Sequence, residues 1–409
     1  MNSITTPTNA TAELAFKANH IGMDLHLDNV VVSVVRNELK NNRIGGKVVT
    51  TRKFNTIGPK NIAELMKWLE EYCAEQPHQA VVESTYNWYW LSDEFEKRGW
   101  NLRLADPCTV SHANLKYAND YTDASYLAEC LRNGSLRTAQ IMDKESRAIR
   151  DLARYRMTLV ADRSRLKTIV INMTANHLSI KYSADKFLKE IDEAIDEANE
   201  MTSRQYTEAE LEKIKGIEQD VDKALAADSE VIAERILAGY YDNRIIRMKV
   251  KSLLRRIRFL SDEVDELDVE LEKLMKPNEN ALLLRTIKGC GPVLSTLIAL
   301  EIGDINRFRR HKDFVSYCRL APTAKLSNGK IKGMGNAKNG NAYLSWALTE
   351  LATGVVRYNK EAKPVYDRLY NRSQLRVKAI RAMAAKLARA IFMMLKTGEV
   401  FDLRRCFGC

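Results

Sequence analysis

The sequence has no apolar run that approaches the roughly 20 residues needed to span a bilayer. Its first ten residues are polar, without the cationic start and apolar stretch of a secretory signal. The 7 cysteines are scattered, odd in number and mostly placed in apolar segments, a usage typical of reduced thiols. We therefore expect a cytoplasmic protein with no membrane partner.

The 409 residues are enough for two or three domains, and a 45% hydrophobic content is ordinary for a folded chain. Charge is unevenly distributed. Residues 281–409 carry 24 lysines and arginines against 8 acidic residues, whereas the whole chain has a net charge of only +11. This basic third predicts a polyanionic partner. A solvated basic surface without a specific ligand is the alternative.

After a leader expected to be disordered over residues 1–19, residues 20–142 show strand and helix patterns in the order βββαβαβα. Apolar and alternating runs predict strands at residues 20–26, 29–37, 47–57, 80–83 and 101–105, with a turn at Gly45-Gly46. Helical periodicity covers residues 60–75, 87–98 and 120–131. This order is that of an RNase H-like, or RuvC-like, domain.

Four acidic residues occupy this domain where such a nuclease places its metal ligands. Asp24 lies in the first strand, Glu83 follows the fourth strand, and Asp120 and Asp123 share one face of a helix at i, i+3 spacing. Four converging carboxylates repel one another unless hard divalent cations lie between them. Two such ions about 3.5–4 Å apart can clamp a phosphodiester. Each acid taken alone is more often a turn former or a helix cap, and it is the combination that favours a metal site.

Residues 143–280 have the pattern of a helical coiled-coil stalk. Apolar residues alternate at spacings of 4 and 3 over four heptads, at Ile246, Val250, Leu253, Ile257, Leu260, Val264, Leu267, Leu271 and Leu274. An earlier run over residues 152–173 has the same period. Pairing within one chain and pairing between chains both fit, and residues 180–230 are either helical or partly disordered.

Residues 281–397 predict a helical DNA-binding domain, followed by a tail at 398–409. A helix leads into Gly289-Cys-Gly291-Pro before a second apolar helix, the pattern of a helix-hairpin-helix whose amides can hold a phosphate. A plain αα-turn in a core is the alternative. Arg309 and Arg310 follow this element as further candidate nucleic-acid contacts.

Residues 320–341 are rich in Gly, Asn and Lys, poor in apolar residues, and predict a loop. The loop contains one serine, Ser327, which in isolation is usually a surface residue. It has no histidine nearby, so a Ser-His-Asp unit is not indicated. We expect nucleic-acid contacts in this segment from Lys325, Lys330, Lys332, Lys338 and Asn341.

These motifs together resemble the DEDD-type transposases of bacterial insertion sequences, the IS110 and IS1111 group, which includes the Piv-type DNA invertases. At the N-terminal end the resemblance rests on Gly22-Met-Asp24, Val82-Glu83-Ser-Thr and Asp120-x-x-Asp123-Ala-x-x-Leu-Ala. At the C-terminal end it rests on Gly289-x-Gly-Pro, Glu301-Ile-Gly-Asp304, Leu320-Ala-Pro, Ser327-x-Gly and Lys338-Asn-Gly-Asn341. The middle 140 residues match only as a helical stalk.

The resemblance implies an RNA-guided recombinase, in which a bridge RNA pairs with donor and target DNA. It implies that Asp24, Glu83, Asp120 and Asp123 bind Mg²⁺, with a two-ion site and Mn²⁺ as a substitute. It also implies that Ser327 attacks the DNA phosphate and forms a covalent phosphoserine link. The serine of one subunit would work with the acids of another in a tetramer, a dimer of dimers, in the nucleoid-associated cytoplasm of a bacterium.

The chain departs from the family pattern at two places. Leu-His-Leu follows Asp24, where the family more often has a small residue and a lysine, and Asn328 separates Ser327 from Gly329. Ser345 and Ser316 are the alternative nucleophiles. Two other functions remain open: a metal-dependent RuvC-like junction nuclease that uses water, and a non-catalytic protein that binds and bridges DNA.

Overall fold

The computed structural model describes residues 18–41, 43–73, 78–84, 86–106, 119–205, 230–276, 278–321, 324–327, 330–334 and 339–408. The chain forms two compact units, Met1–Arg147 and Ala148–Cys409. The predicted leader lies outside the described residues as far as residue 17. Ala18 and Asn19 do not belong to a leader, because both are buried and Asn19 begins the first strand. The other domain boundaries predicted from the sequence stay predictions.

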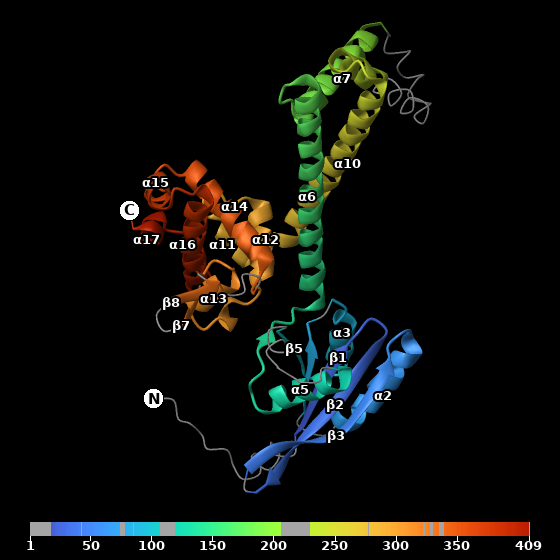
Figure 1. The fold of residues 1–409 in the computed structure, drawn as a ribbon, viewed down its shortest axis with the longest axis vertical. Helices are drawn as coiled ribbons and strands as arrows, with labels where there is room; N and C mark the ends of the chain where they lie inside the picture. Colours follow the sequence, from blue (N-terminus) through green and yellow to red (C-terminus); the bar gives the residue numbers. More distant parts are fainter. Residues whose placement is uncertain are drawn as a thin grey trace. The chain divides into compact units, whose positions relative to one another are not determined.

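The first unit is built on a six-stranded sheet with the order β3-β2-β1-β4-β5-β6 (Figure 1). Its strands are β1 (Asn19–Leu25), β2 (Asn29–Lys40), β3 (Arg43–Asn55), β4 (His78–Glu83), β5 (Leu102–Ala105) and β6 (Thr138–Ala139). The first three strands are antiparallel, and β4 and β5 continue the sheet in parallel with β1. This is the RNase H-like arrangement predicted from the sequence. The two-residue strand β6 is too short to give a sequence pattern.

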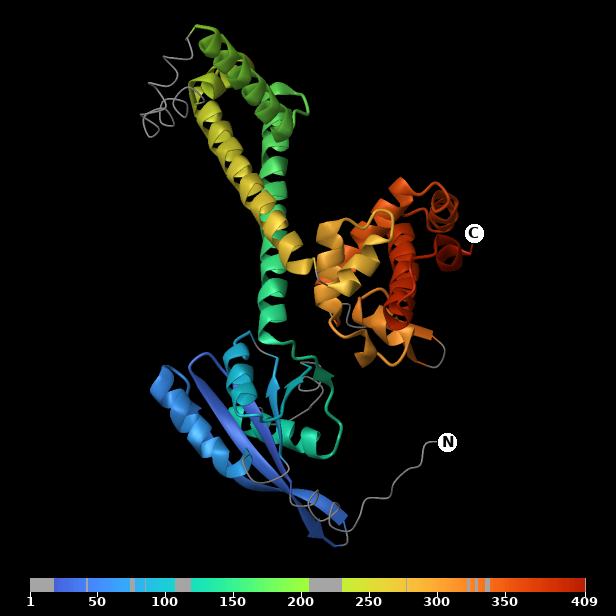
Figure 2. The same ribbon diagram turned by 180° about the vertical axis from the view of Figure 1, so that it is seen from behind.

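Helices cover both faces of this sheet (Figures 1 and 2). Helices α2 (Pro59–Cys73) and α3 (Tyr89–Lys97) pack against one face, where Ile21, Met23 and Leu25 of β1 point. Helix α5 (Asp120–Arg132) packs against the other face. Because side chains alternate along a strand, Gly22 and Asp24 of β1 face α5.

Two glycines allow α5 to lie close to the sheet. A Cβ at Gly22 would come within 2.1 Å of the Ala124 carbonyl oxygen. A Cβ at Gly46 would come equally close to the Glu129 carboxylate. The predicted turn at Gly45-Gly46 is wrong, because both residues pair with β2 inside β3. The glycines there give room for the side chains of α5 instead of reversing the chain.

Helix α6 (Lys144–Leu178), which belongs to the second unit from Ala148 onward, and helix α10 (Arg244–Met275) pack against each other in opposite directions within the same chain. Arg156 of α6 donates two hydrogen bonds to Asp268 of α10, and Arg163 donates one to Ser261. Helix α7 (Ala184–Gln205) contributes to their shared core through Phe187. Regular coiled-coil geometry and pairing between chains stay predictions, and residues 206–229 lie outside the described residues.

The rest of the second unit is a helical domain with one β-hairpin. Its elements are α11 (Glu279–Arg285), α12 (Pro292–Ile302), η1 (Ile305–Arg307), α13 (His311–Tyr317), β7 (Ala324–Ser327), β8 (Lys330–Met334), α14 (Ala342–Tyr358), α15 (Lys363–Ser373), α16 (Arg376–Thr397) and α17 (Leu403–Phe407). Helix α16 contributes a long buried face that includes Met383, Leu387 and Ile391. Over the described residues, no helix is both long and apolar enough to cross a bilayer.

Two expectations for this domain are wrong. The predicted loop at residues 320–341 contains the antiparallel hairpin β7–β8, which its short, lysine- and glycine-rich strands concealed. The predicted tail at residues 398–409 contains α17, and Phe407 there is buried in the same core as α16. The apolar residues Phe401 and Leu403 pack partly against that core as well, so this segment belongs to the folded domain.

Candidate metal centre and serine hairpin

The four predicted acids come from three neighbouring elements of the first unit. Asp24 lies near the end of β1 on the α5 side, and Glu83 is the last residue of the adjacent parallel strand β4. Asp120 and Asp123 lie in the first turn of α5. That turn is fixed by a capping box between Asn119 and Thr122, and the positive end of the helix dipole favours two negative charges there.

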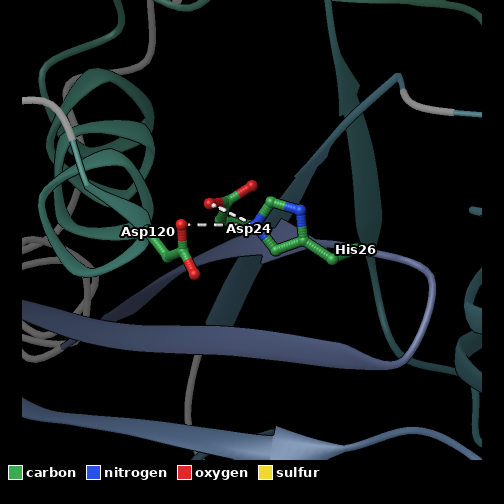
Figure 3. A group of neighbouring side chains, drawn as sticks. All are labelled: Asp24, His26 and Asp120. Carbon is green, nitrogen blue, oxygen red and sulfur yellow. Dashed lines mark ion pairs between the residues drawn. The ribbon is translucent and has the colours of Figure 1, made fainter.

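Asp24, His26 and Asp120 form a tight group (Figure 3). One nitrogen of His26, Nε2, lies 3.2 Å from an oxygen of Asp24 and 3.4 Å from an oxygen of Asp120. One potential ligand atom from each of the three residues lies within 4.8 Å of the other two. The Asp24 side chain is only 10% exposed, whereas those of His26 and Asp120 are more than 40% exposed, so the group opens to solvent.

The protein environment opposes ionisation of three of the four acids. Burial raises the pKa of Asp24, the nearby charges of Asp120 and Asp123 raise it further, and His26 lowers it. Burial raises the pKa of Glu83, with added repulsion from Asp24 and Asp123. Burial raises the pKa of Asp123 as well, and Asp120 adds to this effect. Repulsion therefore links Asp24 to the other three acids, Glu83 to Asp123, and Asp123 to Asp120.

Lys53 provides a second positive charge beside these acids. Its amino group lies 3.7 Å from the other carboxylate oxygen of Asp120. Lys53 of β3 pairs with Val31 of β2, which pairs with Asp24 of β1, so the three residues lie in one row across the sheet. Residues in one row point to the same face, which explains how Lys53 reaches the acidic group.

The predicted nucleophile belongs to the second unit. Ser327 ends β7 and pairs with Lys330 of β8, so it lies at the tip of the β7–β8 hairpin. The hairpin side chains, including those of Ser327, Lys325, Lys330 and Lys332, lie outside the described part of the chain. Residues 328–329 and Lys338 are also outside it. The roles predicted for these residues stay predictions.

The two ends of the segment that carries the hairpin are held together. The Arg319 guanidinium donates to the Gly340 carbonyl, and the Asn341 amide donates to the Tyr317 carbonyl at 2.6 Å. Gly340 has a positive φ of 98°, and a Cβ there would lie 2.4 Å from the Tyr317 carbonyl oxygen. These contacts close the base of the segment and fix the points where it leaves and rejoins the helical domain.

Asn341, predicted as a nucleic-acid contact, has structural bonds. Its side-chain oxygen caps α14 by accepting from the backbone amide of Leu344, and its side-chain nitrogen donates to Glu301 at 2.6 Å. Glu301 is 1% exposed at its side chain and also receives two hydrogen bonds from Arg154 of α6. Arg154 in turn lies over the Tyr343 ring. This network ties the base of the hairpin segment to α6.

Of the other predicted contacts in this unit, Gly289 and Arg310 have structural partners, whereas Gly291 and Arg309 are exposed. Gly289 has a φ of +108°, and a Cβ there would lie 2.9 Å from the backbone of Gly354, so the turn before α12 packs tightly on α14. Gly291 is exposed, and a Cβ there would touch nothing within 4 Å. Arg310 forms an ion pair with Asp313 at 3.0 Å, while Arg309 is exposed. A helix-hairpin-helix role in DNA binding stays a prediction.

Two family models match the chain. One, described as the transposase IS116/IS110/IS902 family, matches residues 281–367, and the other, a DEDD transposase of the IS110 type, matches residues 21–176. The transposase for insertion sequence element IS1328 of Yersinia enterocolitica is 24% identical over 85% of this chain and 92% of its own length. The transposase for IS1111A of Coxiella burnetii is 22% identical over 87% and 85%.

The chain belongs to the IS110 family of transposases. Together the two models cover both ends that carried the resemblance. The Thermus thermophilus RuvC structure is also similar, with a TM-score of 0.23 and 16% identity over 29% of this chain and 98% of that one. The assignment of an RNase H-like fold to this transposase rests on its own strand order.

Membership in this family makes the chain a DNA-recombining enzyme with a DEDD domain, which implies DNA substrates and the use of divalent metal. The residues present fit such a metal. Carboxylate oxygens of Asp24 and Asp120 lie close together beside the His26 nitrogen, and Asp24 is buried. The pKa values of Asp24, Glu83 and Asp123 are raised by burial and by neighbouring acids. Carboxylates held together at this electrostatic cost are the donor set that a hard cation stabilises.

Two residues at this centre of the transposase were not predicted from the sequence. In the sequence His26 stands out only as a departure from the family pattern, although the alternation of β1, continued one residue past Leu25, places residues 22, 24 and 26 on one side. That alternation was the signal that could have identified it. Lys53 had no such signal, because its position depends on the register between β2 and β3.

Proposed function

We propose that this transposase is an RNA-guided DNA recombinase that cuts and rejoins DNA through a covalent link to Ser327. The observation that carries the proposal is the convergence of Asp24 and Asp120, with Glu83 and Asp123 within electrostatic reach, in a chain of this family. The four acids would hold the divalent metal, Mg²⁺ or Mn²⁺. When bound, the metal would neutralise the acids and withdraw charge from the scissile phosphate.

The chemistry at Ser327 is a pair of phosphoryl transfers. The Ser327 hydroxyl oxygen forms a bond to phosphorus and loses its proton, while one DNA ester oxygen leaves and gains a proton as a free hydroxyl. A hydroxyl of the second DNA strand then attacks the phosphoserine, which restores Ser327 and joins the strands. Among the described residues near the hairpin in sequence, His311 is the one histidine.

The position of Ser327 at a hairpin tip supports this role. The closed base formed by Arg319, Gly340 and Asn341 fixes where the segment that carries the hairpin begins and ends. Lys325, Lys330 and Lys332 place positive charge along both strands of the hairpin. Charge of this sign beside the nucleophile would hold the DNA backbone near the serine oxygen.

The acids and the serine belong to separate compact units, and the family resemblance supports a site assembled from two subunits of a tetramer. A bridge RNA that pairs with donor and target DNA completes the proposal. The net charge of residues 281–409 supports a nucleic-acid surface in this third. Binding through phosphates should weaken steeply as salt rises.

A covalent-adduct assay tests the proposal. The full chain, with the RNA that co-purifies with it, is incubated with labelled donor and target DNA and Mg²⁺, then separated under denaturing conditions. The proposal expects labelled DNA on the protein band, absent in Ser327→Ala, while Ser327→Ala still binds DNA and RNA. Ser316→Ala and Ser345→Ala are matched controls that should retain the adduct.

Each other outcome points elsewhere. Cleaved ends without an adduct would indicate a junction nuclease that uses water. Intact DNA that remains bound would indicate a bridging protein without catalysis. An adduct that persists at the wild-type level in Ser327→Ala would move the nucleophile to another residue.

A further inference from the structure

His26 is the residue at the metal centre that the DEDD pattern does not contain. Its Nε2 atom lies 3.2 Å from Asp24 and 3.4 Å from Asp120, so a single nitrogen faces both carboxylates (Figure 3). Ligand atoms about 2.1 Å from a cation and at right angles to each other lie about 3 Å apart. The two distances from His26 therefore match those between neighbouring ligands around one ion, and the two acids lie within 4.8 Å of each other.

The backbone holds His26 in this position from two sides. The His26 amide donates to the Asn29 carbonyl at 2.8 Å, which closes the turn between β1 and β2. The His26 carbonyl accepts from the side chain of Asn87 at 2.6 Å. Asn87 follows Glu83 in the connection after β4, so contacts from the start of β2 and from this connection fix the backbone of the histidine. A ligand held this way needs little reorganisation to bind an ion.

The surroundings of His26 leave room for an ion and a substrate. An open hollow of about 650 Å³ lies beside it, lined by Leu25, His26, Leu27, Asp28, Asn29, Tyr86 and Asp120. The imidazole is 44% exposed, so an ion can reach Nε2 from solvent. Asp24, by contrast, is nearly buried and closes the inner side of the group.

We infer that His26 is a nitrogen ligand of the catalytic metal and that it shifts the preference of this transposase from Mg²⁺ toward Mn²⁺. The inference rests on the proposed metal centre and deepens it. Mg²⁺ strongly prefers oxygen ligands, whereas imidazole suits the later first-row metals and Mn²⁺ accepts both donors better than Mg²⁺ does. An all-oxygen centre would lack this bias.

An ion pair between His26 and the two acids is the competing explanation. The two explanations predict opposite changes in Mn²⁺ affinity when His26 is removed. If His26 is a ligand, removing it takes away a metal–nitrogen bond and weakens Mn²⁺ binding. If His26 is only a positive partner of the acids, removing it lowers the competition for the carboxylates, and Mn²⁺ binds equally well or more tightly.

The test measures metal binding to the metal-stripped full chain, without DNA. The variants are His26→Gln, His26→Asp and, as a matched control, His177→Gln, which replaces an exposed histidine of α6. His26→Gln should raise the Kd for Mn²⁺ by about tenfold or more, since losing even a second-shell partner costs about 10–100-fold. The Kd for Mg²⁺ should change by less than about threefold. His177→Gln should match the wild type for both ions.

Pulsed electron paramagnetic resonance of bound Mn²⁺ adds a direct readout. The wild type and His177→Gln should show coupling to an imidazole nitrogen, and His26→Gln and His26→Asp should lack it. His26→Asp should bind both ions and lower the Mn²⁺-over-Mg²⁺ preference. Thermal melting confirms that each variant is folded before its affinity is compared.

The outcomes separate this inference from the proposed function. No nitrogen coupling in the wild type, or an unchanged or tighter Kd for Mn²⁺ in His26→Gln, overturns the role of His26 while the metal centre stands. Unchanged Mn²⁺ binding in Asp24→Asn overturns the metal centre itself and the inference with it.

Discussion

Asp24 in the first unit and Glu301 in the second are both buried carboxylates, and their surroundings differ sharply. Glu301 receives two hydrogen bonds from Arg154 and one from Asn341. Asp24 has one ion pair, with His26, and its pKa is raised by burial and by two neighbouring acids. A buried charge with full partners holds the fold together, whereas one surrounded by like charges costs stability and indicates a binding site.

The same contrast extends to the glycines. Gly22 lets α5 approach the sheet and brings Asp120 and Asp123 toward Asp24. Gly289 lets the turn before α12 pack closely on α14. It belongs to the second unit, whereas the acids of the metal centre belong to the first. The close approach at Gly22 forms the candidate metal centre, whereas the close approach at Gly289 forms part of the packing of the second unit.

The largest expected effect is the loss of activity when a metal-centre acid is neutralised. Asp24→Asn, Glu83→Gln, Asp120→Asn or Asp123→Asn should each reduce strand exchange by about 10³-fold or more, because each removes a charge that the cation needs. Recombination assays with cognate DNA measure this. Asp313→Asn, which breaks a surface ion pair in the second unit, is the control and should stay within about twofold. Full recombination by two of the four variants would refute the metal centre.

A large effect on stability is expected at Glu301, the buried acid of the second unit. Arg154→Met should lower the free energy of unfolding of the second unit by about 3–5 kcal/mol, because it leaves Glu301 buried without its main partner. Urea unfolding followed by circular dichroism measures the change. Arg156→Met should cost less, because its partner Asp268 is more exposed to solvent than Glu301. Equal losses would show that burial of Glu301 is not the cause.

The glycines give a smaller, matched test. Gly22→Ala and Gly289→Ala should each cost about 1–3 kcal/mol of stability, because both force a Cβ into backbone atoms. Only Gly22→Ala should also weaken Mn²⁺ binding, measured by calorimetry, since it displaces α5. Gly291→Ala has open space and should keep its stability. Weaker DNA binding by Gly291→Ala would support the phosphate-binding turn, and unchanged binding would favour a plain αα-turn.

The first unit was largely predictable because its information is local. Runs such as Ile21–Leu25 and Ala80–Glu83 alternate or stay apolar, and they locate both the strands and the acids at their ends. The helix spacing of Asp120 and Asp123 places both in one turn. Which acids come within a few ångströms of one another depends on how closely α5 approaches the sheet. That approach depends on Gly22, and its effect is visible only in the three-dimensional structure.

The second unit was less predictable because its roles depend on distant partners. Asn341 looks like a loop residue suited to nucleic acid, yet its partner Glu301 lies 40 positions away. Phe407 lies in a segment with no long periodic pattern, and burial against α16 makes it part of the core. The strands of the β7–β8 hairpin lie in a stretch rich in lysine, glycine and asparagine, and this polar composition makes them look like part of a loop.

The smallest effect is a gain of stability in the metal-free protein. Because the pKa of Asp24 is raised in the folded state, its contribution to stability is fully present below its unfolded pKa, near 4, and is lost as pH rises through the folded value. Asp24→Asn should therefore raise the Tm of the metal-free first unit by about 2–4 °C at neutral pH. The gain should shrink as pH falls toward 4.

One measurement tests the central claim most directly: the Tm of wild type and Asp24→Asn, each metal-free and saturated with Mn²⁺. We predict that Mn²⁺ reverses the order of the two Tm values. Without metal Asp24→Asn melts higher, whereas Mn²⁺ at about 100 times its Kd stabilises the wild type by about 2.7 kcal/mol and leaves the variant almost unchanged. A variant that melts lower without metal and keeps the full Mn²⁺ shift would contradict the claim that these acids are held together for a metal ion.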